Sequence, residues 1–524
     1  MHSPDLLTLV QRAGARLGER PFLAVADELE SGAGFARRVD QLARGLRTAG
    51  LQPGDRLVVL LHRSVDEAVV LLAAAAAGGI AVPVNGKLRD DQIAHVIADC
   101  EPFAVVASAT RLLAVRDPEA LLQRQRVFAV GALPTSVVAE PFAALAAAGA
   151  AAPTRLAPLD PASPAALLYT SGSTGLQKGI VQSHHNLCLG AALVAGYLQL
   201  GAHDHVLALL PFSFDYGQNQ LLAALHCGCR ITAADHLGIG ELAELFLRVQ
   251  PTGLAGVPSL WHEVARGLEN GLLGPAHGAS LRYVTNSGGT LRTSDSAILR
   301  RAWPHVRVFA MYGLTEAFRS AFLEPDEFDA HPDSFGRALP GVELLLVDPA
   351  AGAVLSGAAT GELVHCGALV AQGYWRRPHE TAQRFRPDPR GGGGICVYSG
   401  DLVRRDAAGR HFFVGRLDRL LKVQGHRVSP DEVAAAVAGM PGLGEVAVFG
   451  LDGGADGHRL VLVAAGDPAA TDLPQQILRR CRLRLPSYMV PAVVRVLASL
   501  PHNQNGKVDE IALRATIGPC TDAP

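Results

Sequence analysis

The amino-acid sequence predicts an α/β protein with a large N-terminal domain of doubly wound sheets, a small β subdomain and a small α+β domain at the C-terminus. Apolar strands alternate with helical segments early in the chain, which is typical of parallel sheets joined by right-handed crossovers. From Gly341 onward the pattern changes to short strands and turns, and the final stretch has an α+β pattern of its own. We therefore expect a first domain at residues 1–417, with its β-rich part at about 341–417, and a second domain at residues 418–524.

Composition and net charge limit the class of protein. The chain has 524 residues, of which 49% are hydrophobic and 18% charged, so it can bury a large core and is globular rather than disordered. Its formal net charge is -2, and it lacks the clustered lysine and arginine of nucleic-acid-binding proteins. One short basic run at residues 479–484 is typical of the solvated end of a helix. We expect no nucleic-acid partner.

The cysteines and the N-terminus indicate the compartment. The eight cysteines are scattered, and the one close pair, Cys227 and Cys229, has the wrong spacing for a zinc knuckle or a redox motif. Free thiols in a reducing compartment are therefore expected. The first residues lack the build of a signal peptide, and the most apolar run, 68–84, is broken by two glycines and a proline. We expect a cytoplasmic protein without membrane association.

Hydrophobic periodicity places the first elements. Residues 37–50 carry apolar side chains at helical spacing and end at a glycine, and residues 56–61 form an apolar run typical of a buried strand. The same reasoning predicts helices at 64–77 and 90–100 and strands at 80–83 and 104–107. Residues 133–164 are rich in alanine and proline, which predicts a surface excursion.

The segment from Leu167 to Gly179 begins as an apolar strand and continues as a turn rich in hydroxyls and glycine, with Lys178 near its end. Small residues let several backbone N–H groups converge into a nest for phosphate. The order differs from a Walker A loop, in which a hydroxyl residue follows the lysine. A flexible linker is the alternative, but linkers rarely place a lysine here or lie between apolar segments. The predicted phosphate loop comprises Thr170, Ser171, Gly172, Ser173, Thr174, Gly175 and Lys178.

An aspartate stands among aromatic residues farther along the chain. A predicted helix at 186–197 and a strand at 205–210 are followed by Pro211-Phe212-Ser213-Phe214-Asp215-Tyr216-Gly217. A carboxylate in an apolar wall needs a cationic partner, which favours a place for Asp215 in a substrate pocket. Asp215 could equally cap a helix at 218–225, and the local sequence leaves both possibilities open.

Two further strands run into polar turns, at residues 283–289 and 306–316. Open α/β sheets bind ligands at the C-terminal ends of their strands. Thr315 and Glu316 at such an edge could hold magnesium, which takes hard oxygen ligands and substrate phosphates. Another helix cap is the alternative for Glu316.

The remainder of the chain predicts the β subdomain and the C-terminal domain. A charged, glycine-containing segment at 415–428 indicates an exposed link between them, and a turn at 502–509 carries Lys507, which by itself would be solvent-facing. Predicted strands lie at 342–347, 361–364, 397–401, 411–414, 446–450 and 460–464, and predicted helices at 430–437 and 473–484.

Taken together and in this order, these segments resemble the AMP-forming adenylating enzymes: acyl-CoA synthetases, amino-acid adenylation domains and luciferase-like ligases. The resemblance runs from about Arg37 to Asp509 and includes Leu485-Pro486-Ser487-Tyr488-Met489-Val490-Pro491 and the Asn505-Gly506-Lys507 turn. The blocks around Asp215 and Tyr312 look most like stand-alone amino-acid ligases of the proline type and exosortase-associated acyl ligases. The resemblance implies a mobile C-terminal domain with its hinge at Asp418.

The resemblance also implies residue roles. The 170–178 loop would hold the β- and γ-phosphates of ATP, Thr315 would contact the α-phosphate and Glu316 would bind Mg²⁺. Lys507 would bridge the reacting carboxylate and the α-phosphate. The nucleoside would lie against Ser287, Gly288, Gly289, Tyr312 and Gly313, with Tyr312 stacked on adenine and with Asp401 and Arg416 on the ribose.

The implied reaction is ATP-dependent activation of a carboxylic acid as acyl-AMP with release of pyrophosphate. The acid would be an amino acid, and the acyl group would pass to the phosphopantetheine thiol of a carrier protein. The alternative is an acyl-CoA ligase for a fatty, aryl or other organic acid. The pocket would comprise Asp215, Tyr216, Asn219, Gly256, Ser287, Met311 and Arg319, with Asp215 on the α-amine, although Arg319 could neutralise Asp215 instead.

Some points stay open. The loop has Gln177 where the family usually has proline, and Gly34-Phe35-Ala36 replaces the usual aromatic-x-Glu-Leu entry; neither change removes a catalytic group. A non-catalytic nucleotide-binding protein is the competing class, and the intact Lys178, Glu316, Asp401 and Lys507 argue against it. The nucleophile could be an amine instead of a thiol, and the protein could be a monomer or a homodimer.

Overall fold

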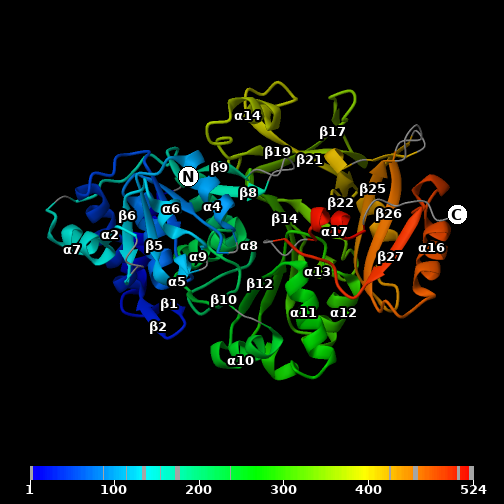
Figure 1. Cartoon of the computed structure of the whole chain (residues 1–524), viewed down its shortest axis with the longest axis horizontal. Helices are drawn as coiled ribbons and strands as arrows, with labels where there is room; N and C mark the ends of the chain where they lie inside the picture. The colour runs from blue at the N-terminus through cyan, green and yellow to red at the C-terminus, as the bar shows by residue number, and fades with distance from the viewer. Residues whose placement is uncertain are drawn as a thin grey trace.

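The computed structural model of this chain describes residues 4–86, 88–113, 115–132, 137–153, 155–171, 177–235, 238–419, 421–423, 426–452, 458–503 and 508–517. Its described strands form one seven-stranded sheet, one fifteen-stranded sheet, a three-stranded sheet and a two-stranded hairpin. Figure 1 shows the helix-rich N-terminal part in blue to green, the β-rich part in yellow and the C-terminal part in orange and red. The predicted α/β class is confirmed.

The seven-stranded sheet carries the predicted phosphate loop at its edge. Its neighbours pair in parallel except for the last two strands, β8 and β9, which form an antiparallel pair on either side of the loop. The order across the sheet is β7 (Glu140–Pro141), β6 (Val127–Val130), β5 (Ala104–Ser108), β3 (Arg56–Leu60), β4 (Ile80–Pro83), β8 (Pro164–Ser171) and β9 (Gln177–Ser183).

The fifteen-stranded sheet runs continuously from a parallel α/β part of the fold into the β-rich part. Strands β1, β11, β10, β12, β13 and β14 pair in parallel, and from β14 onward the pairing is antiparallel. The order is β18 (Val354–Leu355), β17 (Val342–Val347), β19 (Ala359–Gly367), β21 (Ile395–Arg405), β22 (His411–Arg416), β16 (Ser334–Ala338), β15 (Ala317–Phe322), β14 (Arg307–Leu314), β13 (Tyr283–Asn286), β12 (Gly253–Gly256), β10 (His205–Ala208), β11 (Arg230–Ala233), β1 (Pro21–Val25) and β2 (Glu28–Ser31), with β20 (Phe385–Pro387) paired to β21.

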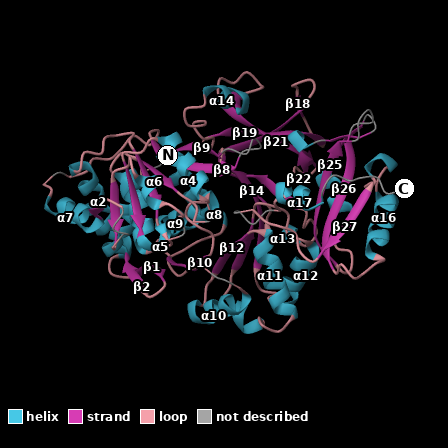
Figure 2. Cartoon of the chain, in the orientation of Figure 1, coloured by secondary structure: helices cyan, strands magenta, loops and turns pink. Residues whose placement is uncertain are grey.

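Helices pack on and between these sheets, as the ribbon coloured by secondary structure shows (Figure 2). The largest core cluster combines residues of α1, α2, α3, α8 and α9 with strand residues of both sheets, so these helices connect the two halves. The helices before residue 400 are α1 (Leu6–Leu17), α2 (Gly32–Thr48), α3 (Val65–Ala76), α4 (Asp90–Cys100), α5 (Ala109–Leu112), α6 (Pro118–Leu122), α7 (Phe142–Ala151), α8 (His184–Tyr197), α9 (Asp215–Cys227), α10 (Ile239–Val249), α11 (Pro258–Glu269), α12 (Thr293–Ala302), α13 (Pro325–Phe328) and α14 (Pro378–Arg384).

The C-terminal part has its own core. Two hydrophobic clusters consist only of residues beyond 420, and both pack against the sheet formed by β25, β26 and β27. This part contacts the β-rich part where the Ser429 hydroxyl donates to the Val414 carbonyl at 3.1 Å. Its elements are β23 (Leu421–Val423), β24 (His426–Val428), α15 (Pro430–Val437), β25 (Leu443–Asp452), β26 (His458–Gly466), α16 (Leu473–Arg484), β27 (Val493–Leu497) and α17 (Glu510–Ile517).

Two expectations need correction. The alanine- and proline-rich stretch is not only a surface excursion, because it contains α7, which packs closely on α2: a Cβ on Gly149 would lie 1.7 Å from the Gln41 carbonyl oxygen. The expectation of free thiols is wrong for Cys366 and Cys396, which form a disulfide between directly opposite positions of β19 and β21. The remaining described cysteines are free. Within the described ranges, every helix is too short or too polar to span a bilayer.

A buried glutamate on α3 makes stability depend on pH. Glu67 is 8% exposed, and burial raises its pKa from 4.5 to about 7, against the opposing effect of the Arg63 guanidinium. The folded chain therefore holds this proton more tightly than the unfolded chain, so stability is lost as pH rises from about 4.5 through 7. The full loss is about 3 kcal/mol.

We expect Glu67→Gln to stabilise the protein by up to about 3 kcal/mol at pH 8 and to have little effect at pH 4.5. The neutral amide keeps the shape of the side chain and removes the charge that burial penalises. Urea unfolding of both proteins at several pH values measures the difference. A stability gain of equal size at pH 4.5 and pH 8 would contradict the assignment.

Candidate functional site

A tyrosine, an aspartate and an arginine from three strands of the large sheet form a hydrogen-bonded chain. The Tyr312 hydroxyl, on β14, donates to Asp401 Oδ2 on β21, and Arg416 Nη1 on β22 donates to Asp401 Oδ1 at 2.8 Å. Asp401 and Arg416 are cross-strand partners, so the sheet register itself brings them together. Burial raises the pKa of Asp401, and the Arg416 guanidinium opposes that rise. The three predicted nucleoside residues therefore lie in one place.

The ring of Tyr312 is supported by other aromatic side chains. Phe335 stacks on it at 4.4 Å between centroids with an interplanar angle of 24°, and His365 lies at 5.7 Å. His365 is held in turn by a 2.7 Å hydrogen bond between its Nδ1 and the Ser320 hydroxyl. The sequence analysis missed Phe335 and His365. They fix the plane of the ring that is predicted to contact adenine.

Thr315 and Glu316 occupy the tight turn between β14 and β15, so Glu316 is not a helix cap. The Tyr374 hydroxyl donates to Glu316 Oε1 at 2.7 Å, and Lys178 Nζ lies 5.4 Å from the centroid of the Tyr374 ring. Tyr374 thus joins the predicted magnesium ligand to the predicted loop lysine. The sequence analysis missed it, although an aromatic pair between a glycine and a basic run was a signal that could have drawn attention to it.

Backbone hydrogen bonds place Tyr374 between Glu316 and Lys178. The segment from Ala371 to Trp375 runs along β9: Val181 N–H donates to the Gly373 carbonyl at 3.0 Å, and Trp375 N–H donates to the Gly179 carbonyl at 2.7 Å. The same segment reaches the turn, because Ala371 N–H donates to the Glu316 carbonyl at 2.8 Å. This strap between the two sheets holds the base of the phosphate loop against the Thr315–Glu316 turn.

Arg384, at the end of α14, lies between the group around Tyr312 and Asp401 and the group around Tyr374. Its positive charge acts on Tyr374, to which it is hydrogen-bonded, and on Tyr312 and Asp401. Within the described residues, its Nε has no hydrogen-bond partner. A buried guanidinium nitrogen without an acceptor is suited to an anionic group of a ligand. The sequence analysis missed this residue as well.

The structure rules out the helix cap as the role of Asp215. This residue is the first residue of α9 and not its cap, since Phe214 holds the cap position. Asp215 is 5% exposed, and its Oδ2 accepts a 3.3 Å hydrogen bond from the Thr315 hydroxyl. Burial raises the pKa of the Asp215 carboxyl, and the charge of Arg319 and the Thr315 hydrogen bond oppose the rise. Thr315 is held from behind by Gln182, whose Nε2 donates to its carbonyl at 2.5 Å.

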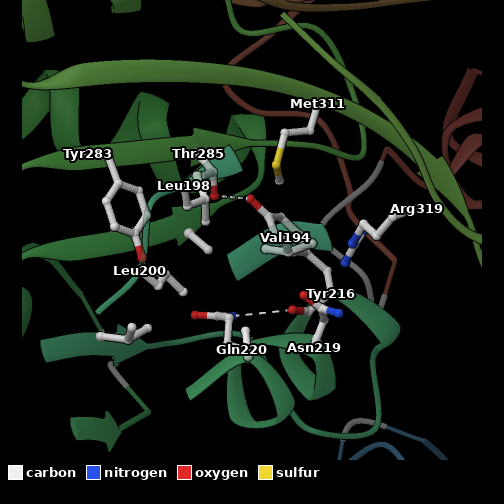
Figure 3. Close-up of a pocket in the computed structure, with 13 residues that line it drawn as sticks. Val194, Leu198, Leu200, Tyr216, Asn219, Gln220, Tyr283, Thr285, Met311 and Arg319 are labelled. Atoms are coloured by element: carbon white, nitrogen blue, oxygen red, sulfur yellow. Dashed lines mark hydrogen bonds between the residues drawn. The ribbon is translucent and has the colours of Figure 1, made fainter. Parts of the chain in front are cut away.

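A small cavity of about 20 Å³ lies between α8, α9 and the strands β10 and β12 to β15 (Figure 3). Of the predicted pocket residues, Tyr216, Asn219, Met311 and Arg319 line it. Asp215, Gly256 and Ser287 are not among its lining residues, and Ala255 lines it next to Gly256. Gly256 instead makes room for Trp261, because a Cβ there would lie 2.7 Å from the indole.

The other predicted residues fall at strand ends. Thr170 and Ser171 end β8, with Thr170 paired to Lys178, and residues 283–289 run from β13 into a turn where Gly288 has φ 82°. Asp418 is the middle residue of the short turn Leu417–Arg419. Gly172, Ser173, Thr174, Gly175 and Lys507 lie outside the described residues.

The residues present fit a magnesium–nucleotide complex. Glu316 bonds Tyr374 through one carboxylate oxygen, which leaves the other for a hard cation. Lys178 and the unpartnered Arg384 Nε supply positive charge near it. A carboxylate, a lysine and an arginine around one turn are the groups that a triphosphate and its cation require.

Comparison with known proteins gives consistent matches. Residues 10–375 match the AMP-binding enzyme family and residues 432–507 its C-terminal domain. The chain is 32% identical to L-proline–[L-prolyl-carrier protein] ligase of Streptomyces coelicolor, over 100% of this chain and 98% of that protein. It is 30% identical to the dimodular nonribosomal peptide synthase of Bacillus subtilis, over 91% of this chain but only 20% of that protein. Among solved structures, ATP-bound MatB from Rhodopseudomonas palustris superposes with a TM-score of 0.85 at 27% identity, covering 97% of this chain and 98% of that one.

Proposed function

This chain belongs to the AMP-binding enzyme family, and from that premise we propose that it activates an amino acid as acyl-AMP and transfers the acyl group to the phosphopantetheine thiol of a carrier protein. It is an AMP-forming ligase, and adenylation of an acid followed by thioester formation is the reaction that its relatives support. The amino acid, the carrier protein, Mg²⁺ and the residue roles below are parts of the proposal.

The proposal that the substrate is an amino acid rests on Asp215. It is a buried carboxylate that, among the described residues, forms no ion pair within 4.0 Å. Leaving a buried carboxylate without a cation is costly, and a substrate ammonium group would supply one. Its neighbour Thr315 is predicted to contact the α-phosphate, so an ammonium at Asp215 would sit beside the reacting carboxylate. The carrier-protein acceptor is supported by the relative from Streptomyces coelicolor.

The chemistry is mainly charge neutralisation and alignment. The acid carboxylate attacks the α-phosphorus of ATP, both reactants are anions, and pyrophosphate leaves. Lys507 would neutralise the carboxylate and the α-phosphate, and Lys178 with the 170–178 loop would hold the leaving group. Mg²⁺ held by Glu316 would supply further positive charge at the phosphates. Asp401 and Arg416 would orient the ribose. Rotation of the C-terminal domain about Asp418 would then allow the thiol to attack the acyl carbon of acyl-AMP, with AMP as the leaving group.

ATP–pyrophosphate exchange with a panel of amino acids, fatty acids and aryl acids tests the proposal. We expect exchange with at least one amino acid, and thioester formation with a phosphopantetheinylated carrier protein rather than with free CoA. Exchange confined to acids without an amine would overturn the choice of an amino acid. Thioester formation with CoA alone would overturn the choice of a carrier protein.

Tyr374 provides a test of the phosphate side of the site. Tyr374→Phe keeps the ring beside Lys178 and removes the hydrogen bonds that the hydroxyl forms with Glu316 and Arg384. A hydrogen bond to a charged group contributes about 1.5–3 kcal/mol, so we expect adenylation to fall about 10- to 100-fold. Steady-state exchange kinetics at varied ATP and Mg²⁺ measures the change. Tyr169→Phe is the matched control, because it removes a 2.7 Å hydrogen bond from a tyrosine to Asp99, and it should leave adenylation within a few fold of wild type. An equal effect of both substitutions would contradict the role of Tyr374.

A further inference from the structure

Arg319 is a buried cation with two nitrogens that find no hydrogen-bond partner in the described part of the chain. It lies on β15 and is 3% exposed. It lines the cavity drawn in Figure 3. Within the described residues, its Nε and Nη2 have no hydrogen-bond partner. Buried guanidinium groups are ordinarily paired, because removing the charge from water is expensive. These two nitrogens therefore indicate a ligand that carries hydrogen-bond acceptors.

Neighbouring aromatic rings contact the guanidinium but do not supply hydrogen-bond acceptors for its nitrogens. Its Cζ lies 4.7 Å from the centroid of the Tyr216 ring and 5.7 Å from that of Phe318. These contacts fix the plane of the group and stabilise part of its charge. They accept no hydrogen bond in the plane of the guanidinium, where a carboxylate would bind through both oxygens.

Asp215 does not supply the missing partner in this arrangement. The charge of Arg319 acts on Asp215, yet the two side chains form no ion pair within 4.0 Å. Asp215 is instead turned toward the Thr315 hydroxyl, on the side of the predicted α-phosphate. The two opposite charges thus stand at separate places, one toward the reacting end of the pocket and one on the wall of the cavity.

The cavity beside Arg319 has room for one polar group of about the size of a water molecule. Its volume of about 20 Å³ is close to that of a single water molecule, and most of its lining is aliphatic or aromatic. Among the described residues, Asn219 Nδ2 is a third donor without a partner, and Gln220 Oε1 is an acceptor without one. Gln220 Nε2 donates to the Tyr216 carbonyl at 3.5 Å. Donors therefore exceed acceptors in the lining of the cavity, and two of the three donors belong to Arg319. A short side chain ending in an anionic acceptor matches this set.

We propose that the substrate is a short amino dicarboxylic acid, of about the length of aspartate or glutamate, whose second carboxylate is bound by Arg319. The inference rests on the proposed function, in which Asp215 binds the substrate ammonium. An ammonium bound at Asp215 leaves the charge of Arg319 without a counterion in a buried site, and a second carboxylate restores the balance. Arg319 is then a specificity-determining residue.

The wild-type enzyme is tested first, by ATP–pyrophosphate exchange with L-aspartate, L-glutamate, their amides asparagine and glutamine, L-proline and the amine-free acid succinate. We expect kcat/KM for one of the two amino dicarboxylic acids to exceed that for its own amide at least 100-fold. Comparable or faster exchange with a neutral amino acid, proline included, would overturn the inference and leave the proposed function standing. Exchange with succinate alone would overturn both, and would mean that Asp215 and Arg319 neutralise each other.

Arg319→Gln is then compared with Arg319→Lys. We expect Arg319→Gln to lose at least 100-fold in kcat/KM for the dicarboxylic substrate, mostly through KM, with the KM for ATP unchanged and with the preference over the amide abolished. Arg319→Lys should recover part of the preference, because it restores the charge but not the paired donors. Arg307→Gln, which also removes an arginine lying over a ring, 5.3 Å from Phe309, is the matched control and should leave the preference intact.

Two measurements guard against a folding defect and a water-filled cavity. Circular dichroism and thermal unfolding of each variant check the fold. If Arg319→Gln does not fold, Arg319→Met and the wild-type substrate panel still test whether Arg319 binds a second carboxylate. If ordered water alone satisfies Arg319, the variants should keep the wild-type preference among substrates, and that result would overturn the inference.

Discussion

Lys507→Ala is expected to lower the rate of adenylate formation by about 10²- to 10³-fold, which corresponds to the loss of one preorganised donor at a site of developing charge. The resemblance places this lysine between the acid carboxylate and the α-phosphate, where two anions must approach each other. Once acyl-AMP exists, that repulsion has been overcome. The thiolysis of a supplied acyl-AMP should therefore continue at close to the wild-type rate.

The two half-reactions are measured separately, by ATP–pyrophosphate exchange and by thioester formation from synthetic acyl-AMP. Lys507→Arg keeps the charge with a different geometry and should retain more exchange than the alanine variant. Lys87→Ala is the control for loss of a lysine elsewhere and should leave both steps unchanged. Equal loss of both half-reactions in Lys507→Ala would contradict the assignment.

Asp215→Ala should abolish the use of amino acids more strongly than any other change in the pocket. If the substrate ammonium loses its buried partner, the expected loss is about 2–5 kcal/mol, or about 30- to 5000-fold in kcat/KM for the amino acid. The KM for ATP should change little, because the proposed partner of Asp215 is the acid and not the nucleotide. Exchange kinetics with the preferred amino acid and with its amine-free analogue separates these effects.

The controls isolate the charge of Asp215 from its shape. Asp215→Asn keeps the side-chain volume and an acceptor for the Thr315 hydroxyl, and should lose nearly as much activity as the alanine variant. Asp295→Ala removes another buried aspartate, 3% exposed and 3.3 Å from His262, and should affect stability but not substrate preference. An alanine variant of Asp215 that loses the amino acid and its amine-free analogue to the same degree would count against ammonium binding.

A double-mutant cycle joins this prediction to the one on Arg319. Asp215 and Arg319 influence each other electrostatically without forming an ion pair. If they bind separate groups of one substrate, the double variant should lose about the product of the two single fold losses in kcat/KM, because the corresponding free energies add. If they serve mainly as each other's counterion, the double variant should recover activity relative to either single one.

Much of the architecture could be predicted because it is encoded locally. Helices α4, α15 and α16 begin and end at the predicted residues, and Ser64 caps α3 through its hydroxyl. Amphipathic periodicity and caps act within one or two turns, so a short window of sequence is enough to find them. Helix α1 and the β1–β2 hairpin were not predicted. The disulfide joins Cys366 and Cys396, which are 30 residues apart in the chain, and depends on the register of the two strands that carry them.

The sequence by itself determined the α/β class, the family and the chemical groups at the ends of the strands, because motif order and hydrophobic periodicity are properties of the chain alone. Only the tertiary structure decided how those groups meet. Tyr374 reaches Glu316 and Lys178 through a strap between two sheets, and Asp215 stands apart from Arg319 because α9 and β15 present them at different places. Contacts between segments distant in the chain arise from packing and strand register, which no local pattern records.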